Sequence, residues 1–337
     1  MIHEFKLLLE TAQDWQEQNH KIVLATVVDL VGSSYRRPGV RMLLNETGDA
    51  VGAVSGGCVE KEVHRQAKSV FLSGIPKMMQ YDGRVRLGCE GILYVLLEPF
   101  EPQKGLLDLF RKAWQQRKPI EIHSRFLQEI GEESSLRSCL YFDNEEVTFR
   151  TDITESDIKT QLFKQELSPA QQLYIFGAEH DAVALCSLAH QMGWEVTVVA
   201  APDEQKTKNF FPGSHQLLTP LPENIPVDTI DDQTAVLLMS HSFTKDLQYL
   251  LALQESRPAY LGLLGPAHRR ERLMSELLER QPEIDPDFLA LCYGPAGIHI
   301  GAESAHEIAL SIMAEILSVM RKSELQPLRQ KTGRIHE

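Results

Sequence analysis

The chain has few cysteines, and their spacing fits none of the common cysteine-based architectures. Five occur in 337 residues, none of them in a CxxC pair, at Cys58, Cys89, Cys139, Cys186 and Cys292. An odd number of widely spaced cysteines argues against a disulfide framework and against a structural zinc site. Five scattered cysteines also cannot supply the iron–sulfur clusters of a large redox enzyme.

Long apolar runs, a basic N-terminus and an excess of positive charge are missing as well. No apolar run approaches the ~18 residues that span a bilayer, and the start MIHEFKLLLETAQDWQ lacks the features of a signal peptide. We therefore expect a cytoplasmic protein. The net charge of −13 disfavours nucleic acid and anionic membranes as partners, because neither is attracted at long range.

What is present is the composition of a folded protein with more than one core. Hydrophobic residues make up 43% of the chain, charged residues make up 24%, and the length exceeds that of a usual single domain. A polar, weakly periodic stretch over 151–170 predicts a linker. We accordingly predict an N-terminal domain over 1–150, a C-terminal domain over 171–322 and a polar tail over 323–337.

The first domain is predicted to be α+β. Apolar residues at helical spacing over 2–19 predict a helix, and the β-branched run 21–32 predicts a strand. By the same criteria we expect further strands at 41–54, 91–99, 138–143 and 146–150, and further helices at 59–74 and 106–117.

The second domain is predicted to be a Rossmann-like, doubly wound parallel sheet. Its short apolar runs alternate with helical segments, which is typical of βαβ units whose sheet is buried on both faces. We expect strands at 173–177, 194–200, 215–220, 235–240 and 260–265, and helices at 180–192, 244–256, 267–280 and 303–320.

An arginine-rich loop in the first domain is a candidate anion site. The segment GSSYRRPGVRM at 32–42 carries Arg36, Arg37 and Arg41 between glycines. Guanidinium groups present a planar fork of donors that suits phosphate or carboxylate. A solvated turn is the alternative.

Two glycine-flanked cysteines are candidate metal ligands or nucleophiles. In SGGCVE, formed by Ser55, Gly56, Gly57, Cys58, Val59 and Glu60, the thiol lies at a predicted helix N-terminus, which would lower its pKa. Cys89 lies in LGCEG, just before a strand, where glycines allow close approach. Thiolates favour soft metals, but the spacing leaves open whether the two cysteines meet, and buried packing is the alternative. We assign Cys139, Cys186 and Cys292 to packing.

The first strand of the second domain runs into a helix where a dinucleotide fingerprint would lie. Of its three glycines only Gly177 is present, since Glu179 and Ala182 occupy the other two positions. A carboxylate near the phosphate position argues against ordinary NAD(P) binding.

Loops at the carboxyl ends of the predicted strands supply the remaining candidates. Ligands of doubly wound sheets bind at this edge, so His241, Gly265 and Arg269, with Ser240, Arg270 and the glycine-rich segment 294–304, are expected to line one crevice. His241 and the arginines are candidate phosphate ligands. A local cap at His241 and a solvated helix face for the arginines are the alternatives.

Taken together, these motifs resemble the XdhC/CoxI family of molybdenum hydroxylase accessory proteins. The resemblance rests on GSSYRRPG, SGGCVE and LGC in the first half, and on SHSFTKDLQYL, YLGLLG and GPAGIHIGAESAHEIALSIMAEI in the second, so it spans nearly the whole chain. The chain departs from the family pattern at Glu90, Glu179 and Ala182, each of which replaces a glycine.

The resemblance implies a maturation factor that binds molybdenum cofactor transiently and delivers it to a xanthine dehydrogenase-like apo-hydroxylase. It implies a non-catalytic chaperone that works with a cysteine desulfurase or sulfurtransferase, and a homodimer by analogy. On this hypothesis Cys58 and Cys89 contact the metal end of the cofactor, and Arg36, Arg37 and Arg41 face the pterin phosphate.

Two other hypotheses stay open. The chain would be an NAD(P)-linked oxidoreductase if its Rossmann-like domain tolerates Glu179. It would be a docking module between a sulfurtransferase and an apo-hydroxylase if the cysteines are only structural.

Overall fold

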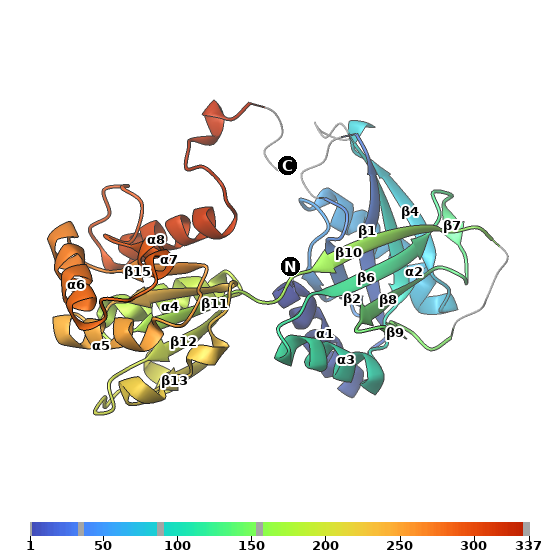
Figure 1. Cartoon of the computed structure of the whole chain (residues 1–337). Helices are drawn as coiled ribbons and strands as arrows, with labels where there is room; N and C mark the ends of the chain where they lie inside the picture. Colours follow the sequence, from blue (N-terminus) through green and yellow to red (C-terminus); the bar gives the residue numbers. More distant parts are fainter. Residues whose placement is uncertain (1, 33–36, 86–90, 153–157, 333–337) are drawn as a thin grey trace. The chain divides into compact units, whose positions relative to one another are not determined.

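The computed structural model describes residues 2–32, 37–85, 91–152 and 158–332. Within it the chain forms two compact units, Met1–Pro169 and Ala170–Glu337, each with its own core (Figure 1). Among the described residues, no helix is both long and apolar enough to cross a membrane. Arg36 and Cys89, two of the candidate site residues, lie outside the described residues, and so does the side chain of Cys58.

The first unit contains an antiparallel sheet with a helix on one face. Its strands follow the order β3 (Ala50–Gly52), β2 (Arg41–Asn45), β1 (Ile22–Val31), β5 (Ile92–Pro99), β4 (Lys77–Asp82) and β7 (Gly131–Glu132). Helix α2 (Cys58–Ser73) buries Val59, Val63, Ala67 and Val70 against this sheet. These four residues recur at helical spacing, which explains why the sequence pattern predicted the helix.

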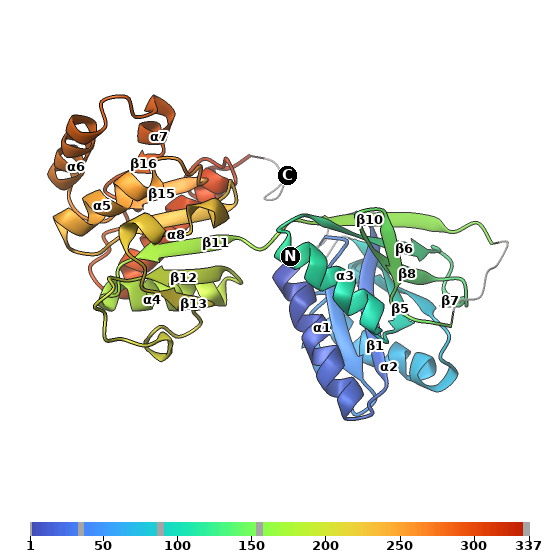
Figure 2. The same ribbon diagram turned by 60° about the horizontal axis from the view of Figure 1, so that its bottom comes forward.

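A second antiparallel sheet covers the other face, and its order is β10 (Gln161–Leu167), β6 (Ile120–Phe126), β8 (Arg137–Phe142) and β9 (Glu145–Thr148). Val28, Met78 and Leu96 of the first sheet pack against Phe126 of the second. Helices α1 (Ile2–Glu17) and α3 (Lys104–Gln115) lie side by side in Figures 1 and 2. Phe5 and Phe110 join them with ring centroids 5.8 Å apart. The predicted α+β architecture is confirmed.

The predicted linker requires a correction. Residues 161–167 form β10, which pairs with β6 along its whole length, and the division between the units falls after Pro169. β10 is an edge strand with one exposed face, so its sequence QLFKQEL carries few apolar residues and looks like a polar connector. Strands β4 and β6 were not predicted either: β4 shows no regular alternation, whereas β6 does alternate buried and less buried positions, with the polar Ser124 at one of the buried ones.

The second unit is built on a six-stranded parallel sheet. Its order is β13 (Gln216–Leu218), β12 (Glu195–Val199), β11 (Gln172–Phe176), β14 (Thr234–Leu238), β15 (Tyr260–Leu263) and β16 (Cys292–Tyr293). This is the Rossmann strand order, so the predicted doubly wound fold is confirmed. From β11 the sheet grows toward one edge through β12 and β13 and toward the other through β14, β15 and β16, so the switch point of the topology lies between β11 and β14.

Helices cover both faces of the parallel sheet. On one face lie α4 (His180–Gln191) and α8 (Ala305–Met320), and on the other lie α5 (Phe243–Leu253), α6 (Ala267–Arg280) and α7 (Pro286–Ala290). Alternate strand residues serve the two layers, since Ile175 faces the first and Phe176 the second. Burial on both faces explains why the strands are almost continuously apolar.

Candidate functional site

The SGGCVE turn is shaped by the carboxylate of Glu60. Its Oε1 accepts a hydrogen bond from the Ser55 N–H at 2.6 Å, and its Oε2 accepts one from the Gly57 N–H at 2.5 Å. Gly57 has φ +100°, a conformation that favours glycine, and α2 begins at the next residue, Cys58. The predicted position of Cys58 at a helix N-terminus is confirmed. Both carboxylate oxygens of Glu60 accept hydrogen bonds from backbone N–H groups, so this residue positions the turn that carries the cysteine.

The three arginines of the neighbouring loop do not share one environment. Arg37 is exposed. Arg41, in contrast, begins β2 and is only 8% exposed. Its Nη1 donates to Gly39 O at 2.9 Å and to Gln165 Oε1 at 2.6 Å, while its Nε and Nη2 are buried and have no hydrogen-bond partner. Arg41 is therefore a buried guanidinium with unused donors.

Few groups near Arg41 can compensate its charge. Burial lowers the pKa of Arg41 to about 10, against the opposing influence of Glu98 and Glu4. Among the described residues no carboxylate comes within the 4 Å of an ion pair with it. Glu98 is fully buried on β5 and accepts from Ser138 N at 2.8 Å, and burial raises the pKa of its carboxyl group.

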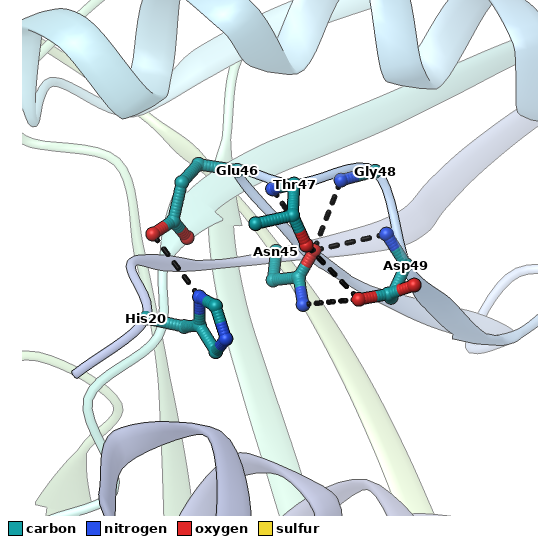
Figure 3. A network of polar contacts seen from close by, with 6 residues as sticks. All are labelled: His20, Asn45, Glu46, Thr47, Gly48 and Asp49. Carbon is teal, nitrogen blue, oxygen red and sulfur yellow. Dashed lines mark hydrogen bonds and ion pairs between the residues drawn. The ribbon is translucent and has the colours of Figure 1, made fainter. Parts of the chain in front are cut away.

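A polar network fixes the β2–β3 hairpin next to Arg41. Asn45 Oδ1 accepts hydrogen bonds from the backbone N–H groups of Thr47, Gly48 and Asp49, at 2.9 to 3.1 Å (Figure 3). Asn45 Nδ2 donates to Asp49 Oδ2 at 3.0 Å. These bonds occupy the turn's own polar groups, so its role is to hold the hairpin whose strands carry Arg41 and Gly52.

The cysteines assigned to packing are buried. Cys139, Cys186 and Cys292 are at most 6% exposed, and burial raises the pKa of each thiol, to about 12, about 11 and about 12 respectively. A thiol that stays protonated at neutral pH is a poor nucleophile and a poor metal ligand. Within the described part of the chain, no group of three or more His, Cys, Asp or Glu side chains could hold a metal ion.

In the second unit, Gly177 closes the turn between β11 and α4. Its φ is +142°, its N–H donates to Val199 O at 2.9 Å, and an added Cβ would lie 2.4 Å from Met239 O. Ala182 is fully buried at the position where a helix packs on its strand. Glu179 precedes α4, and its Oε2 lies 3.8 Å from Lys206 Nζ. The turn has the Rossmann shape, with a carboxylate in place of the second glycine.

His241 lies beside this turn, at the point where the strand order reverses. Its backbone is left-handed, with φ +56°, and its Nε2 lies 3.3 Å from Asp181 Oδ2 in the first turn of α4. This contact joins the loop after β14 to the start of α4. The structure thus brings His241 and the Gly177 turn to the same edge of the sheet.

Arg269 reaches the same loop through a carboxylate that the sequence analysis did not identify. Asp246, 1% exposed in the first turn of α5, accepts from Arg269 Nη2 at 2.7 Å and from Ser240 Oγ at 2.5 Å. Gly265 has φ +119°, and an added Cβ there would lie 2.7 Å from Arg269 Cδ. Arg269 is therefore fixed by protein groups.

The glycine-rich segment before α8 is anchored by Glu315. One carboxylate oxygen, Oε2, accepts from Gly297 N at 2.8 Å and from Tyr260 Oη at 2.6 Å. No local pattern singles out Asp246 or Glu315, since their partners lie 6 to 55 residues away in the chain.

Both halves of the chain are similar to known proteins of one family. A family model described as the XdhC Rossmann domain matches residues 173–316, and one described as the XdhC and CoxI family matches residues 15–82. A Bacillus subtilis (strain 168) protein, named as a probable subunit of xanthine dehydrogenase, is 30% identical over 323 residues, covering 91% of this chain and 95% of that protein.

Two further comparisons extend this result. The molybdenum cofactor insertion chaperone PaoD of Escherichia coli (strain K12) is 27% identical over 307 residues, covering 90% of this chain and 84% of PaoD. A crystal structure described as a xanthine dehydrogenase from Bacillus halodurans has a TM-score of 0.74 and 26% identity, covering 94% of this chain and 96% of that one.

Proposed function

The chain belongs to the XdhC and CoxI family, and on that premise we propose that it is a maturation factor for a xanthine dehydrogenase-type molybdenum hydroxylase. It binds molybdenum cofactor as cargo and hands it to the apo-enzyme. The observation that carries this proposal is the similarity over 84% of PaoD, a molybdenum cofactor insertion chaperone. As finer parts of the proposal, the protein acts in the cytoplasm, as a homodimer, and receives the cofactor's sulfur from a cysteine desulfurase or sulfurtransferase.

The residues of the first unit suit such a cargo. Molybdopterin carries a phosphate and a soft, dithiolene-bound metal, for which arginine donors and a thiolate are suitable contacts. We propose that Cys58, held at the start of α2 by the Glu60-braced turn, meets the metal end together with Cys89. Arg36 and Arg37 remain the proposed phosphate ligands.

An NAD(P)-linked oxidoreductase is the alternative function. The Rossmann strand order and the Gly177 turn favour it. The carboxylate of Glu179 at the N-terminus of α4 opposes it, because a pyrophosphate placed there would meet a like charge.

The test is anaerobic equilibrium binding of the purified full chain to molybdenum cofactor and, separately, to NAD and NADP. Wild type is compared with Cys58→Ser and with the matched control Cys139→Ser, which makes the same change at a buried cysteine of the same unit. We expect tight cofactor binding that weakens at least about tenfold in Cys58→Ser, since a lost metal–thiolate contact exceeds ~1.4 kcal/mol.

Dinucleotide binding without cofactor affinity would overturn the proposal and favour the oxidoreductase. Cofactor binding that is equal in wild type and Cys58→Ser would remove the thiol from the site. Absence of both cofactor and dinucleotide binding would favour a docking module with structural cysteines.

A further inference from the structure

The first unit contains a cavity of about 260 Å³ between α1 and the β2–β3 hairpin. Its apolar wall includes Phe5, Leu7 and Leu8 of α1. The hairpin contributes Arg41 and Ala53, and the cavity therefore begins two residues before the Ser55 turn that leads to Cys58.

Two groups of opposite charge line this otherwise apolar cavity. One is Glu4, an exposed carboxylate in the first turn of α1. The other is Arg41, whose Cζ lies 5.7 Å from the centre of the Phe5 ring and whose Nε and Nη2 have no protein partner. These two nitrogens form one edge of the guanidinium, the edge that pairs with two acceptor positions at once.

A buried donor without an acceptor costs free energy in the ligand-free protein. Arg41 is 8% exposed, and its two unpartnered nitrogens each have less than 1 Å² of accessible surface. A ligand therefore reaches them only if the cavity wall shifts, and it then gains more than it would from a solvated arginine. The cavity is thus a built site with one acceptor side chain, one donor side chain and an aromatic wall.

Resting on the proposed function, we infer that this cavity takes the pterin heterocycle of the cofactor. A pterin is flat, with faces that suit Phe5 and Leu8. Its N3–H and 2-amino group form a donor pair that a carboxylate such as Glu4 accepts, and its 4-oxo group is an acceptor for the Arg41 edge.

The lining of the cavity argues against the sequence-based expectation that Arg41 binds the phosphate of the cofactor. A phosphate dianion in this cavity would share it with the carboxylate of Glu4, and like charges in a partly buried site repel. The pterin end therefore enters beside Arg41, and the metal end extends toward the Ser55–Cys58 turn.

The experiment measures binding of free, fluorescent pterin, of inorganic phosphate and of whole molybdenum cofactor to the full chain under anaerobic conditions. Glu4→Gln weakens the carboxylate contact, and Leu7→Trp fills the mouth of the cavity. Glu10→Gln makes the same amide change on the same helix outside the cavity, and Leu72→Trp makes the same aromatic change at an 86% exposed site on α2.

We expect Glu4→Gln to weaken binding of pterin and of cofactor about tenfold, as for the loss of one charge-assisted contact, and Leu7→Trp to weaken it about as much by occupying part of the cavity. Both controls should bind like wild type, and phosphate should not displace the pterin. Absence of pterin binding, equal binding in all variants, or displacement by phosphate would each overturn the assignment.

The outcomes separate this inference from the proposed function. Cofactor binding that is unchanged in both cavity variants overturns the cavity assignment and leaves the maturation role standing. Pterin binding that depends on Glu4, in a protein with no affinity for whole cofactor, keeps the cavity and overturns the maturation role.

Discussion

Arg41 in the first unit and Arg269 in the second are both candidate ligand-binding arginines with mainly buried side chains, yet they are supported differently. Arg269 Nη2 lies 2.7 Å from Asp246 Oδ2, and that carboxylate also accepts from Ser240. Arg41 has one nitrogen bonded to neutral oxygens and two nitrogens without a partner.

This difference indicates that Arg269 stabilises the fold, whereas Arg41 is available to a ligand. Asp246 and Arg269 are hydrogen-bonded to each other, so this ion pair stabilises the loops after β14 and β15 whether or not a ligand binds there. The Nε and Nη2 groups of Arg41 have no acceptor among the described protein groups, so only an acceptor from elsewhere can bond to them. Each prediction below tests one side of this contrast.

The largest effect is expected when the self-contained pair is broken. Arg269→Met leaves the buried carboxylate of Asp246 without its cation and should lower the free energy of unfolding of the second unit by about 3 kcal/mol. Trp194 is the only tryptophan of that unit, so its fluorescence during urea unfolding reports the change once Trp15 and Trp114 are replaced by Phe.

The control for this prediction is Glu276→Ala on the same helix. It removes an exposed i,i+4 ion pair with Arg280 and should cost no more than about 0.5 kcal/mol. If Arg269→Met proves as mild as this control, Asp246 does not depend on Arg269, and the contrast with Arg41 fails.

A smaller effect on stability is expected at the Gly177 turn, where protein backbone also occupies the space and accepts the Gly177 N–H. Gly177→Ala, at φ +142°, would place a Cβ 2.4 Å from Met239 O, whereas Gly131→Ala, at φ +146°, meets nothing within 4 Å. Both variants incur backbone strain, and the collision should add about 2 kcal/mol at Gly177 alone. Urea unfolding of the two variants gives this difference, and equal losses would show that the turn has room for a ligand group.

The fold was largely predictable from the sequence, and the site only in part. Short, continuous apolar runs located strands β11 to β15 of the second unit, because its sheet is buried on both faces, and helical periodicity located its longer helices, while α7 and β16 were not predicted. Strand β10 was taken for a linker, because an edge strand with an exposed face needs few apolar residues.

The site needed information that no local pattern contains. Arg41 is among the candidates that the sequence analysis names, but one of its hydrogen-bond partners, Gln165, lies 124 residues away in the chain. The sequence alone therefore could not tell a buried guanidinium from the exposed one at Arg37. The acidic partner of Arg269 was missed for the same reason, since Asp246 lies 23 residues away on another helix.

The smallest effect on stability is expected at Arg41. Arg41→Met keeps a similar volume and removes an unpaired buried charge, while Gly39 O and Gln165 Oε1 each lose one hydrogen bond. These terms oppose each other, so the free energy of unfolding of the first unit should change by no more than about 1 kcal/mol.

Binding should respond to the same substitution in the opposite way. Arg41→Met removes the two donors that the ligand-free protein leaves unused, so pterin affinity should fall by about tenfold or more while stability is nearly unchanged. Arg269→Met should show the reverse, a large loss of stability with unchanged pterin affinity at a temperature where both units stay folded. If Arg41→Met unfolds the first unit as severely as Arg269→Met unfolds the second, Arg41 is a structural charge, and the distinction between the two arginines disappears.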